Sequence, residues 1–449
     1  MRDAALLVIF ASLIPFVLVR PWTGVLVWSW VGFMNPHRLG WGVAQDLPVA
    51  LVFGSLTLVA MWLHSDRKPI PLTRETVLII LLMIVFTITT FTAWVPEAAW
   101  PQWEKVMKIL AFALVTTMLI YGRKRILALL VVVAGSLAFY GVKGAAFVAS
   151  TGGQYRVKGP EPSFIGANTA LGLALLMVLP LLVALAREVD STWGRRAIYG
   201  VVVLTVIATL FTYSRGALLG LAVVLPIMLI KANRKFLLFL LLIPAAYKAP
   251  DFIPERLMER AESIEQYEED RSAMQRIQAW QVGWNVALER PWLGAGFKLE
   301  EAPNALWLDY AEWQDEHFNR SRAAHSNYFQ MLGEHGFLGT ALYLLLLFFT
   351  FGSLRRIKKQ APGVGLGWMV KYADALQTGL IAYAVAGAFL SLAYFDLFYT
   401  FVILAAIMRR EIAEATEKVA AHASDVRGPL SRAPARAATP VPAQMPRGV

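Results

Sequence analysis

Long apolar runs recur along almost the entire chain, and they limit its fold more than any other feature. A helix needs about 20 apolar residues to cross a hydrocarbon core of about 30 Å. Runs close to that length lie near residues 4–20, 47–64, 75–94, 104–121, 125–149, 167–187, 197–213, 216–231, 235–253, 326–353 and 373–408. With 57% hydrophobic and 16% charged residues, the chain is unsuited to a soluble domain with a polar surface. The sequence predicts an all-α, polytopic helical bundle in a membrane.

Two segments decide how many helices this bundle has. A single helix over residues 373–408 would be about 50 Å long, so we expect a hairpin that turns at Tyr394-Phe395-Asp396. The Trp-rich segment 21–46 is open to two interpretations, a re-entrant or interfacial piece and a further span. We expect about 12 transmembrane helices with both termini in the cytoplasm.

The basic residues indicate how the bundle is oriented. The formal net charge is +11, but the cations recur in short clusters between alternate apolar runs, which is typical of cytoplasmic loops and not of a nucleic-acid surface. The clusters are Arg67-Lys68 with Arg74, Arg123-Lys124-Arg125, Arg195-Arg196, Lys231 with Arg234-Lys235, Arg355-Arg356 with Lys358-Lys359, and Arg409-Arg410. We therefore expect a multi-pass protein of the bacterial inner membrane, with membrane lipids around it and no nucleic-acid partner.

This topology divides the chain into four regions. Residues 1–247 are expected to form an N-terminal transmembrane bundle, and 248–325 one large periplasmic loop with amphipathic helices. Residues 326–410 are expected to form the C-terminal transmembrane helices. Residues 411–449, rich in Ala, Pro and Arg, are predicted to be a cytoplasmic tail, a frayed helix followed by disorder.

Several cations lie on the outward side, against the orientation bias. Lys105, Lys108, Lys143, Arg156 and Arg215 belong to outward helix ends or loops, where a buried cation is costly unless an anion compensates it. One explanation is a bound phosphate; the other is that each side chain reaches out to a lipid headgroup. Arg215 stands out because it follows a tight turn next to a glycine, and its planar guanidinium suits phosphate oxygens.

Two glycine-rich stretches bear on the same question. Gly141-Val142-Lys143-Gly144 and the loop 152–160, which contains Arg156, lack the spacing and the preceding strand of a nucleotide-binding loop. They could still bring backbone amides and cations to an anion, or serve as ordinary connectors.

The polar segment 248–325 contributes the remaining candidates. Ile277, Trp280, Trp284 and Leu288 recur at helical spacing, and Arg276 lies one turn before Trp280. His325 stands where this segment meets an apolar helix. A titratable imidazole at a membrane edge is a candidate for chemistry, and it could equally be a packing or capping residue. The chain has no cysteine, which excludes thiol catalysis and thiolate metal sites.

Taken in order, five motifs resemble the O-antigen ligase and polymerase superfamily. They are Ser214-Arg215-Gly216, Arg276 with Trp280, Trp292-Leu293-Gly294-Ala295-Gly296, His325-Ser326-Asn327-Tyr328, and Gly333 to Gly339. Further upstream, Arg20-Pro21-Trp22, Met34 to Arg38, Gly141 to Gly144 and the loop 152–160 resemble the branch of exosortase-associated O-glycosylation ligases.

The resemblance implies an O-antigen ligase of lipopolysaccharide biosynthesis. Such an enzyme is an inverting, metal-independent glycosyltransferase that moves a glycan from undecaprenyl pyrophosphate to a sugar hydroxyl of lipid A-core at the periplasmic face. By match to the family, His325 is the expected general base and Arg215 and Arg276 bind the pyrophosphate. Lys105, Lys108, Lys143 and Arg156 are further candidates for donor or core phosphates, chosen from topology. No cofactor and no metal are expected.

Other functions fit parts of this pattern. A protein O-oligosaccharide ligase or an O-antigen polymerase would use the same donor with another acceptor. A lipid-linked glycan transporter would explain the spans and the outward cations, although no clear internal repeat is visible. A structural scaffold for polysaccharide assembly would make His325 dispensable. His335, nearly three turns deeper in the apolar helix, is expected to be a packed, hydrogen-bonded residue.

Overall fold

The structure is a computed structural model, and it describes residues 2–40, 42–231 and 271–427, with the side chains of 423–427 excepted. Within these ranges all regular structure is helical. The longer helices are α1 (Arg2–Val19), α2 (Pro21–Met34), α3 (Val49–Leu63), α4 (Arg74–Phe91), α5 (Pro96–Leu119), α6 (Gly122–Thr151), α7 (Asn168–Ala186), α8 (Thr192–Leu210), α9 (Arg215–Ile230), α12 (Arg271–Glu289), α14 (Asn327–Gln360), α15 (Met369–Ala386) and α16 (Asp396–Arg427). The short ones include η1 (Pro36–Leu39), η2 (Val43–Asp46), α13 (Asn304–Leu308) and η6 (Gly387–Phe389).

Six helices in the described ranges are long and apolar enough to cross a membrane. They are α1, α4, α6, α7, α8 and α14, while α3 and α9 are shorter apolar helices. The protein is thus a multi-pass helical membrane protein. The expected span 235–253, the boundary at 247 and the end of the tail lie outside the described residues, and the total of about 12 spans stays a prediction.

The last apolar run is divided as predicted. Helix α15 ends at Ala386, the short η6 follows, and α16 begins at Asp396, so the run forms two helices. The segment 21–46 contains α2, η1 and η2, and α2 packs against α3 and α6. Helix α16 continues to Arg427, well into the region predicted as a tail.

Helix α7 lies at the centre of one half of the bundle. It packs against α6, α8, α9 and α15, and 83% of its apolar stretch is buried inside the protein. A helix that is apolar on every side belongs in such a position. Helix α8 lies at the periphery, and only 17% of its apolar stretch is buried. It exposes apolar side chains such as Trp193 and Val203. We infer that this side of the molecule faces lipid.

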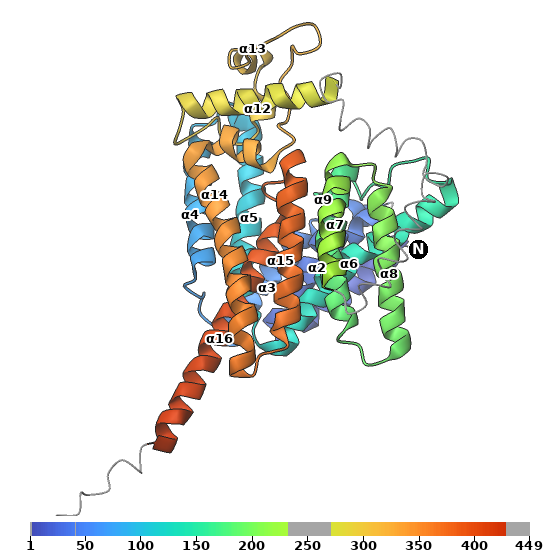
Figure 1. The fold of residues 1–449 in the computed structure, drawn as a ribbon, viewed down its shortest axis with the longest axis vertical. Coiled ribbons are helices and arrows are strands. Elements are labelled where there is room, and N and C mark those ends of the chain that lie inside the picture. Colours follow the sequence, from blue (N-terminus) through green and yellow to red (C-terminus); the bar gives the residue numbers. More distant parts are fainter. Residues whose placement is uncertain (1, 41, 232–270, 428–449) are drawn as a thin grey trace, which may run out of the picture.

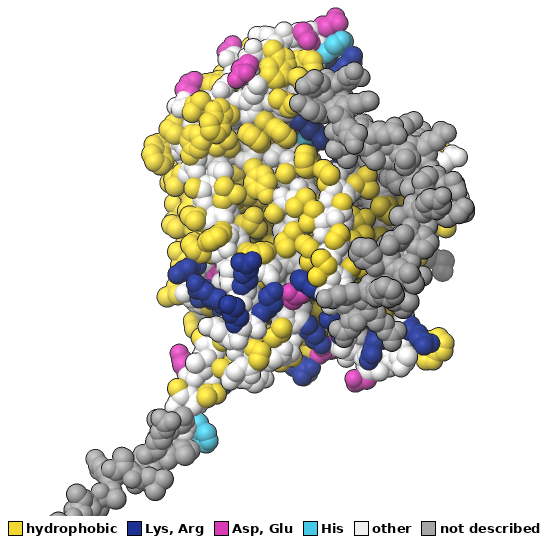
Figure 2. Space-filling view, viewed as in Figure 1, with side chains coloured by type: hydrophobic (Ala, Val, Ile, Leu, Met, Phe, Trp, Pro, Cys, Tyr) yellow, Lys and Arg dark blue, Asp and Glu magenta, His cyan; other side chains and the backbone are white. Residues whose placement is uncertain are grey.

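The two ends of the bundle differ. Helix α12 lies across one end, above α4, α5, α14 and α15, and α16 leaves the bundle at the other (Figure 1). Figure 2 shows an apolar band between these ends, with Lys and Arg gathered on the side where α16 leaves. We call these the α12 end and the α16 end.

Ion pairs show that the basic clusters of the sequence share the α16 end. Arg123 and Lys371 pair with Glu188, and Lys231 and Lys358 pair with Asp374. Arg125 pairs with Asp66 at 2.9 Å, and Lys68 is hydrogen-bonded to Glu414. Cations far apart in the sequence therefore gather on one side of the apolar band, as the positive-inside pattern predicts.

Candidate functional site

Helix α12 holds the residues on both sides of His325. The Trp280 ring nitrogen donates a hydrogen bond to the carbonyl oxygen of Ala324 at 2.7 Å. The same ring stacks on Phe329, with 5.1 Å between centroids and 5° between planes. His325 itself has a φ of 45°, in the left-handed region that side chains rarely adopt. Backbone strain of this kind is found disproportionately at functional sites.

The charge of Arg276 acts on His325. The imidazole is exposed at the surface, yet the surrounding protein desolvates it, and this burial lowers its pKa below the ordinary 6.5. The Arg276 guanidinium lowers the pKa of His325 further. Both causes favour the neutral ring near pH 7, which is the form that accepts a proton.

Arg215 is the first residue of α9, where it lies against the end of α15. Ser214 caps the helix by accepting a hydrogen bond from the amide of Ala217 at 3.3 Å. A Cβ on Gly216 would lie 3.2 Å from the carbonyl oxygen of Ala386. A side chain at position 216 would therefore crowd this close packing.

The same short segment also contacts the start of α14. A Cβ on Gly387 would lie 2.4 Å from the side-chain nitrogen of Asn327, which is two residues after His325. The starts of α9 and α14 thus pack against the same segment, the end of α15 and η6. This arrangement brings Arg215 and His325 to the same end of the bundle.

Helix α14 fixes this segment by polar contacts as well. The Asn327 side-chain oxygen accepts a hydrogen bond from the amide of Leu392 at 2.6 Å, and that of Gln330 accepts one from Ala393 at 3.2 Å. The Tyr328 hydroxyl donates to the carbonyl oxygen of Ala384 at 2.7 Å. The segment from Ala384 to Ala393 is consequently held by side chains as well as by packing. We call this segment the platform of His325 and Arg215.

Two of the glycine motifs are paired with each other. The amide of Ala295 donates to the carbonyl of Gly333, and that of Gly296 to Glu334, both at 2.8 Å. Gly294 and Gly336 have φ values of 59° and 63°, and Gly336 kinks α14. A Cβ at Gly336 would lie 2.4 Å from the carbonyl oxygen of Pro291. Only glycine allows the two backbones to meet in this way.

His335 is buried below this contact, as expected. It is 0% exposed, its Nδ1 lies 2.7 Å from the Thr89 hydroxyl, and its Nε2 lies 2.7 Å from the Tyr394 hydroxyl. Both nitrogens of the His335 ring thus have hydrogen-bond partners. The neighbouring Glu334 is 2% exposed, accepts a hydrogen bond from Tyr394, and accepts another from the amide of Lys298 at 3.2 Å.

The glycine-rich loop 152–160 is attached to the turn before Arg215. The amide of Val157 donates to the carbonyl of Phe211 at 3.0 Å, and the Tyr213 hydroxyl donates to the carbonyl of Gly153. Arg156 is exposed on this loop, next to Val157, whose amide is bonded to the turn before Arg215. Lys143 is exposed on α6, next to Gly144, where a Cβ would lie 2.8 Å from Val157.

The two candidates on α5 differ. The Lys105 ammonium lies 3.6 Å from the centroid of the Phe164 ring, on the connection that follows the glycine-rich loop. Lys108 instead forms an ion pair with Glu104 one turn earlier on the same helix. Lys105 thus lies against the connection that leads into α7, whereas the charge of Lys108 is partly compensated within α5.

The sequence reasoning passed over two charged residues beside the site. Arg322 and Glu334 line a small pocket together with Ala324, Phe329 and Gln330. Glu334 had a sequence signal, because a carboxylate in an apolar helix needs a partner. Arg322 had none, since it lies in a polar segment with other arginines. Among the described residues, no cluster of three or more His, Asp or Glu side chains could hold a metal ion.

Two family models match the chain. Residues 1–188 match a family of unknown function (DUF5935), and residues 200–344 match the O-antigen ligase family. No curated protein matches the chain. The second match spans Arg215, Arg276 and His325. It supports placing the chain in the O-antigen ligase/polymerase superfamily, whose members are membrane glycosyltransferase-like ligases or polymerases.

Proposed function

We propose that this protein is an O-antigen ligase that moves a glycan from undecaprenyl pyrophosphate to a sugar hydroxyl of lipid A-core. The reaction takes place at the periplasmic face of the bacterial inner membrane, which corresponds to the α12 end. The observation that carries the proposal is the position of His325, next to the charge of Arg276 and on the same platform as Arg215.

In this reaction His325 removes the proton from the acceptor hydroxyl. The hydroxyl oxygen attacks the anomeric carbon, and the bond from that carbon to the pyrophosphate oxygen breaks. Attack opposite to the leaving group inverts the anomeric centre. A base with a lowered pKa is suited to this step, because it is neutral at the pH at which it must work.

The leaving group determines what the cations do. Undecaprenyl pyrophosphate departs with additional negative charge, so its departure is favoured by fixed positive groups. Arg215 and Arg276 take this role, and Arg156 and Lys105 assist with donor or core phosphates. Because protein cations supply this charge, the reaction is proposed to need no metal and no cofactor. Lys108 and Lys143 are weaker candidates. Lys108 is paired with Glu104, and Lys143 is exposed on the side of α6.

A transfer assay with three acceptors tests this proposal. Purified protein would receive one lipid-linked glycan together with lipid A-core, a protein, or a second donor molecule, each in chelator. Glycan on lipid A-core is the expected product. Glycan on the protein or on the second donor would instead identify a protein ligase or a polymerase. Movement of intact donor across a vesicle membrane without transfer would indicate a transporter.

A further inference from the structure

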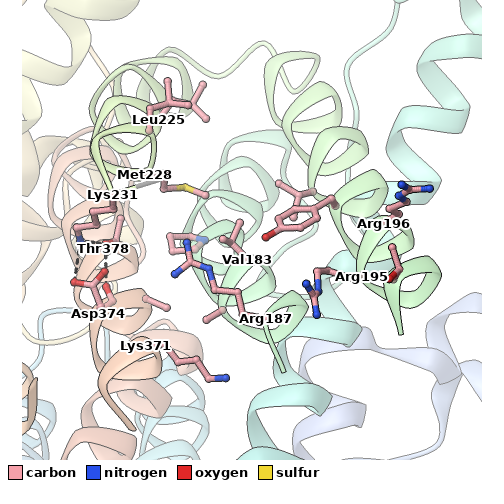
Figure 3. Close-up of a pocket in the computed structure, with 17 residues that line it drawn as sticks. Val183, Arg187, Arg195, Arg196, Leu225, Met228, Lys231, Lys371, Asp374 and Thr378 are labelled. Atoms are coloured by element: carbon pink, nitrogen blue, oxygen red, sulfur yellow. Dashed lines mark hydrogen bonds and ion pairs between the residues drawn. The ribbon is translucent and has the colours of Figure 1, made fainter. Parts of the chain in front are cut away.

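A second site lies at the α16 end, far from His325. A cavity of about 940 Å³ opens between α7, α8, α9 and α15 (Figure 3). Helices α8 and α9 both pack on α7 but contact each other little, and this leaves the cavity between them. Its volume is in the range of sites that bind small organic ligands.

The lining of this cavity has two chemically different parts. Its inner wall is apolar and includes Val183, Val202, Leu225 and Met228. In the described part of the chain, its rim is basic, with five cations and a single carboxylate, that of Asp374. The cations are Arg187, Arg195, Arg196, Lys231 and Lys371. The combination suits a molecule that has both an anionic group and apolar chains.

Among the residues that the structure describes, carboxylates pair with two of these five cations. Lys231 lies 3.0 Å from Asp374, and Lys371 pairs with Glu188. In Figure 3, Arg187 and Arg195 lie between the Lys231–Asp374 pair and Arg196. Arg195 donates to the carbonyl of Val189 at 3.1 Å, and Arg196 lies over the Trp193 ring at 5.4 Å. Within the described part of the chain, no carboxylate pairs with any of the three arginines.

The cavity cannot hold the same phosphate as the candidate active site. Along α9, Arg215 and Lys231 are 16 residues apart, which corresponds to about 24 Å of helix. The rim lies with the basic clusters at the α16 end, which the positive-inside pattern assigns to the cytoplasm. An anion on this rim therefore belongs to the opposite leaflet from the proposed reaction.

We propose that this cavity binds one anionic glycerophospholipid of the cytoplasmic leaflet. Its phosphate contacts Arg187 and Arg195, Arg196 adds positive charge to the rim, and its acyl chains lie against Val183, Leu225 and Met228. A free phosphate would leave the apolar wall unfilled, and a zwitterionic lipid would bring no net charge to the rim. The bound lipid fills the space between α8 and α9, so it also stabilises the poorly buried α8.

The test measures lipid retention by the purified protein in the absence of donor. The protein would be exchanged into detergent with equimolar phosphatidylglycerol and phosphatidylcholine, and the retained lipid quantified by native mass spectrometry. The wild type is expected to retain about one phosphatidylglycerol in preference to phosphatidylcholine. In the triple variant Arg187→Gln, Arg195→Gln, Arg196→Gln, the ratio of retained phosphatidylglycerol to retained phosphatidylcholine should fall by at least about tenfold. The matched control, Arg355→Gln, Arg356→Gln, Lys359→Gln, removes three exposed cations from the end of α14 and should keep it.

A second variant tests the apolar wall independently of charge. Met228→Trp should fill part of the cavity and lower retention while the rim cations stay. Equal retention of both lipids by the wild type, or an unchanged preference in the triple variant, would refute the proposal. The proposal would also be wrong if polyprenyl diphosphate displaced phosphatidylglycerol from the wild type and the triple variant failed to bind polyprenyl diphosphate. Because no donor is needed for the main test, its outcome is separate from that of the transfer assay.

Discussion

The two ends of the bundle use their cations differently. At the α16 end several of the clustered cations have carboxylate partners, as in the pairs of Glu188 with Lys371 and of Asp374 with Lys358. At the α12 end, Arg276 is close to the neutral imidazole of His325, and Arg215 starts a helix that packs against backbone. Paired charges tie helices together, whereas positive charge beside a neutral base is suited to receive an anionic substrate. The predictions below test this difference, beginning with the largest expected effect.

Replacement of His325 should affect transfer most. His325→Ala is expected to lower the transfer rate by about 10²–10⁴-fold, because the acceptor hydroxyl loses its base. The thermal midpoint should change little, since the ring is exposed. His317→Ala is the matched control, because His317 is an exposed histidine in the same polar segment and pairs only with neighbouring groups. Wild-type transfer by His325→Ala would remove the general base from the proposal.

Geometry should matter at Arg215 more than charge. Arg215→Lys keeps the cation but loses the planar pair of donors, and we expect transfer to fall by about 10–100-fold. Arg125→Lys provides the comparison at the other end, because Arg125 is bound to both oxygens of Asp66. That variant should lose stability in a thermal melt and retain transfer. If the two variants behaved alike, the distinction between the ends would be wrong.

The pH dependence of transfer should show how the charge of Arg276 affects the pKa of His325. The neutral form of His325 is active and its pKa is lowered, so kcat/KM should stay level above pH 6.5 and decrease only below the lowered pKa. Arg276→Gln removes one cause of the lowering, so the acid limb should shift to higher pH. Arg271→Gln, at the start of the same helix, should leave the profile in place. An unshifted limb in Arg276→Gln would show that this arginine does not act on the base.

The smallest effect is expected at Glu188. Lys371, Arg123 and Tyr372 act against the burial of this carboxyl and lower its pKa to about 2. Its contribution to stability is therefore complete above the unfolded value of 4.5 and lost as the pH falls through about 2. Glu188→Gln should lower stability by about 1 kcal/mol near pH 7 and leave transfer unchanged. A thermal melt and the transfer assay check both statements.

Much of the fold could be predicted from the sequence, since apolar length and charge placement act locally. The division of 373–408 into two helices and the gathering of the basic clusters at one end are confirmed. The pair of Glu104 with Lys108 could also have been anticipated, because the two residues are one helical turn apart. This pairing makes Lys108 a weaker phosphate candidate than its position at the outward end of a helix indicates.

The remaining features depend on contacts between distant parts of the chain. The left-handed conformation of His325 and the kink at Gly336 result from packing that no local pattern encodes. The same holds for the cavity between α8 and α9, which exists because two helices share a neighbour without touching each other closely. The three family motifs at Arg215, Arg276 and His325 were recognised by resemblance, and the structure adds how the chain brings them together.

The close approach of Gly216 and Gly387 to their neighbours limits which residues the chain tolerates at the α12 end. A Cβ at Gly216 would lie 3.2 Å from the carbonyl oxygen of Ala386, and one at Gly387 would lie 2.4 Å from the side-chain nitrogen of Asn327. The distance between the start of α9 and the start of α14 therefore depends on small residues at these two positions. In the proposed reaction this fixes the backbone positions of Arg215 and His325, while their side chains stay free to adjust to the donor.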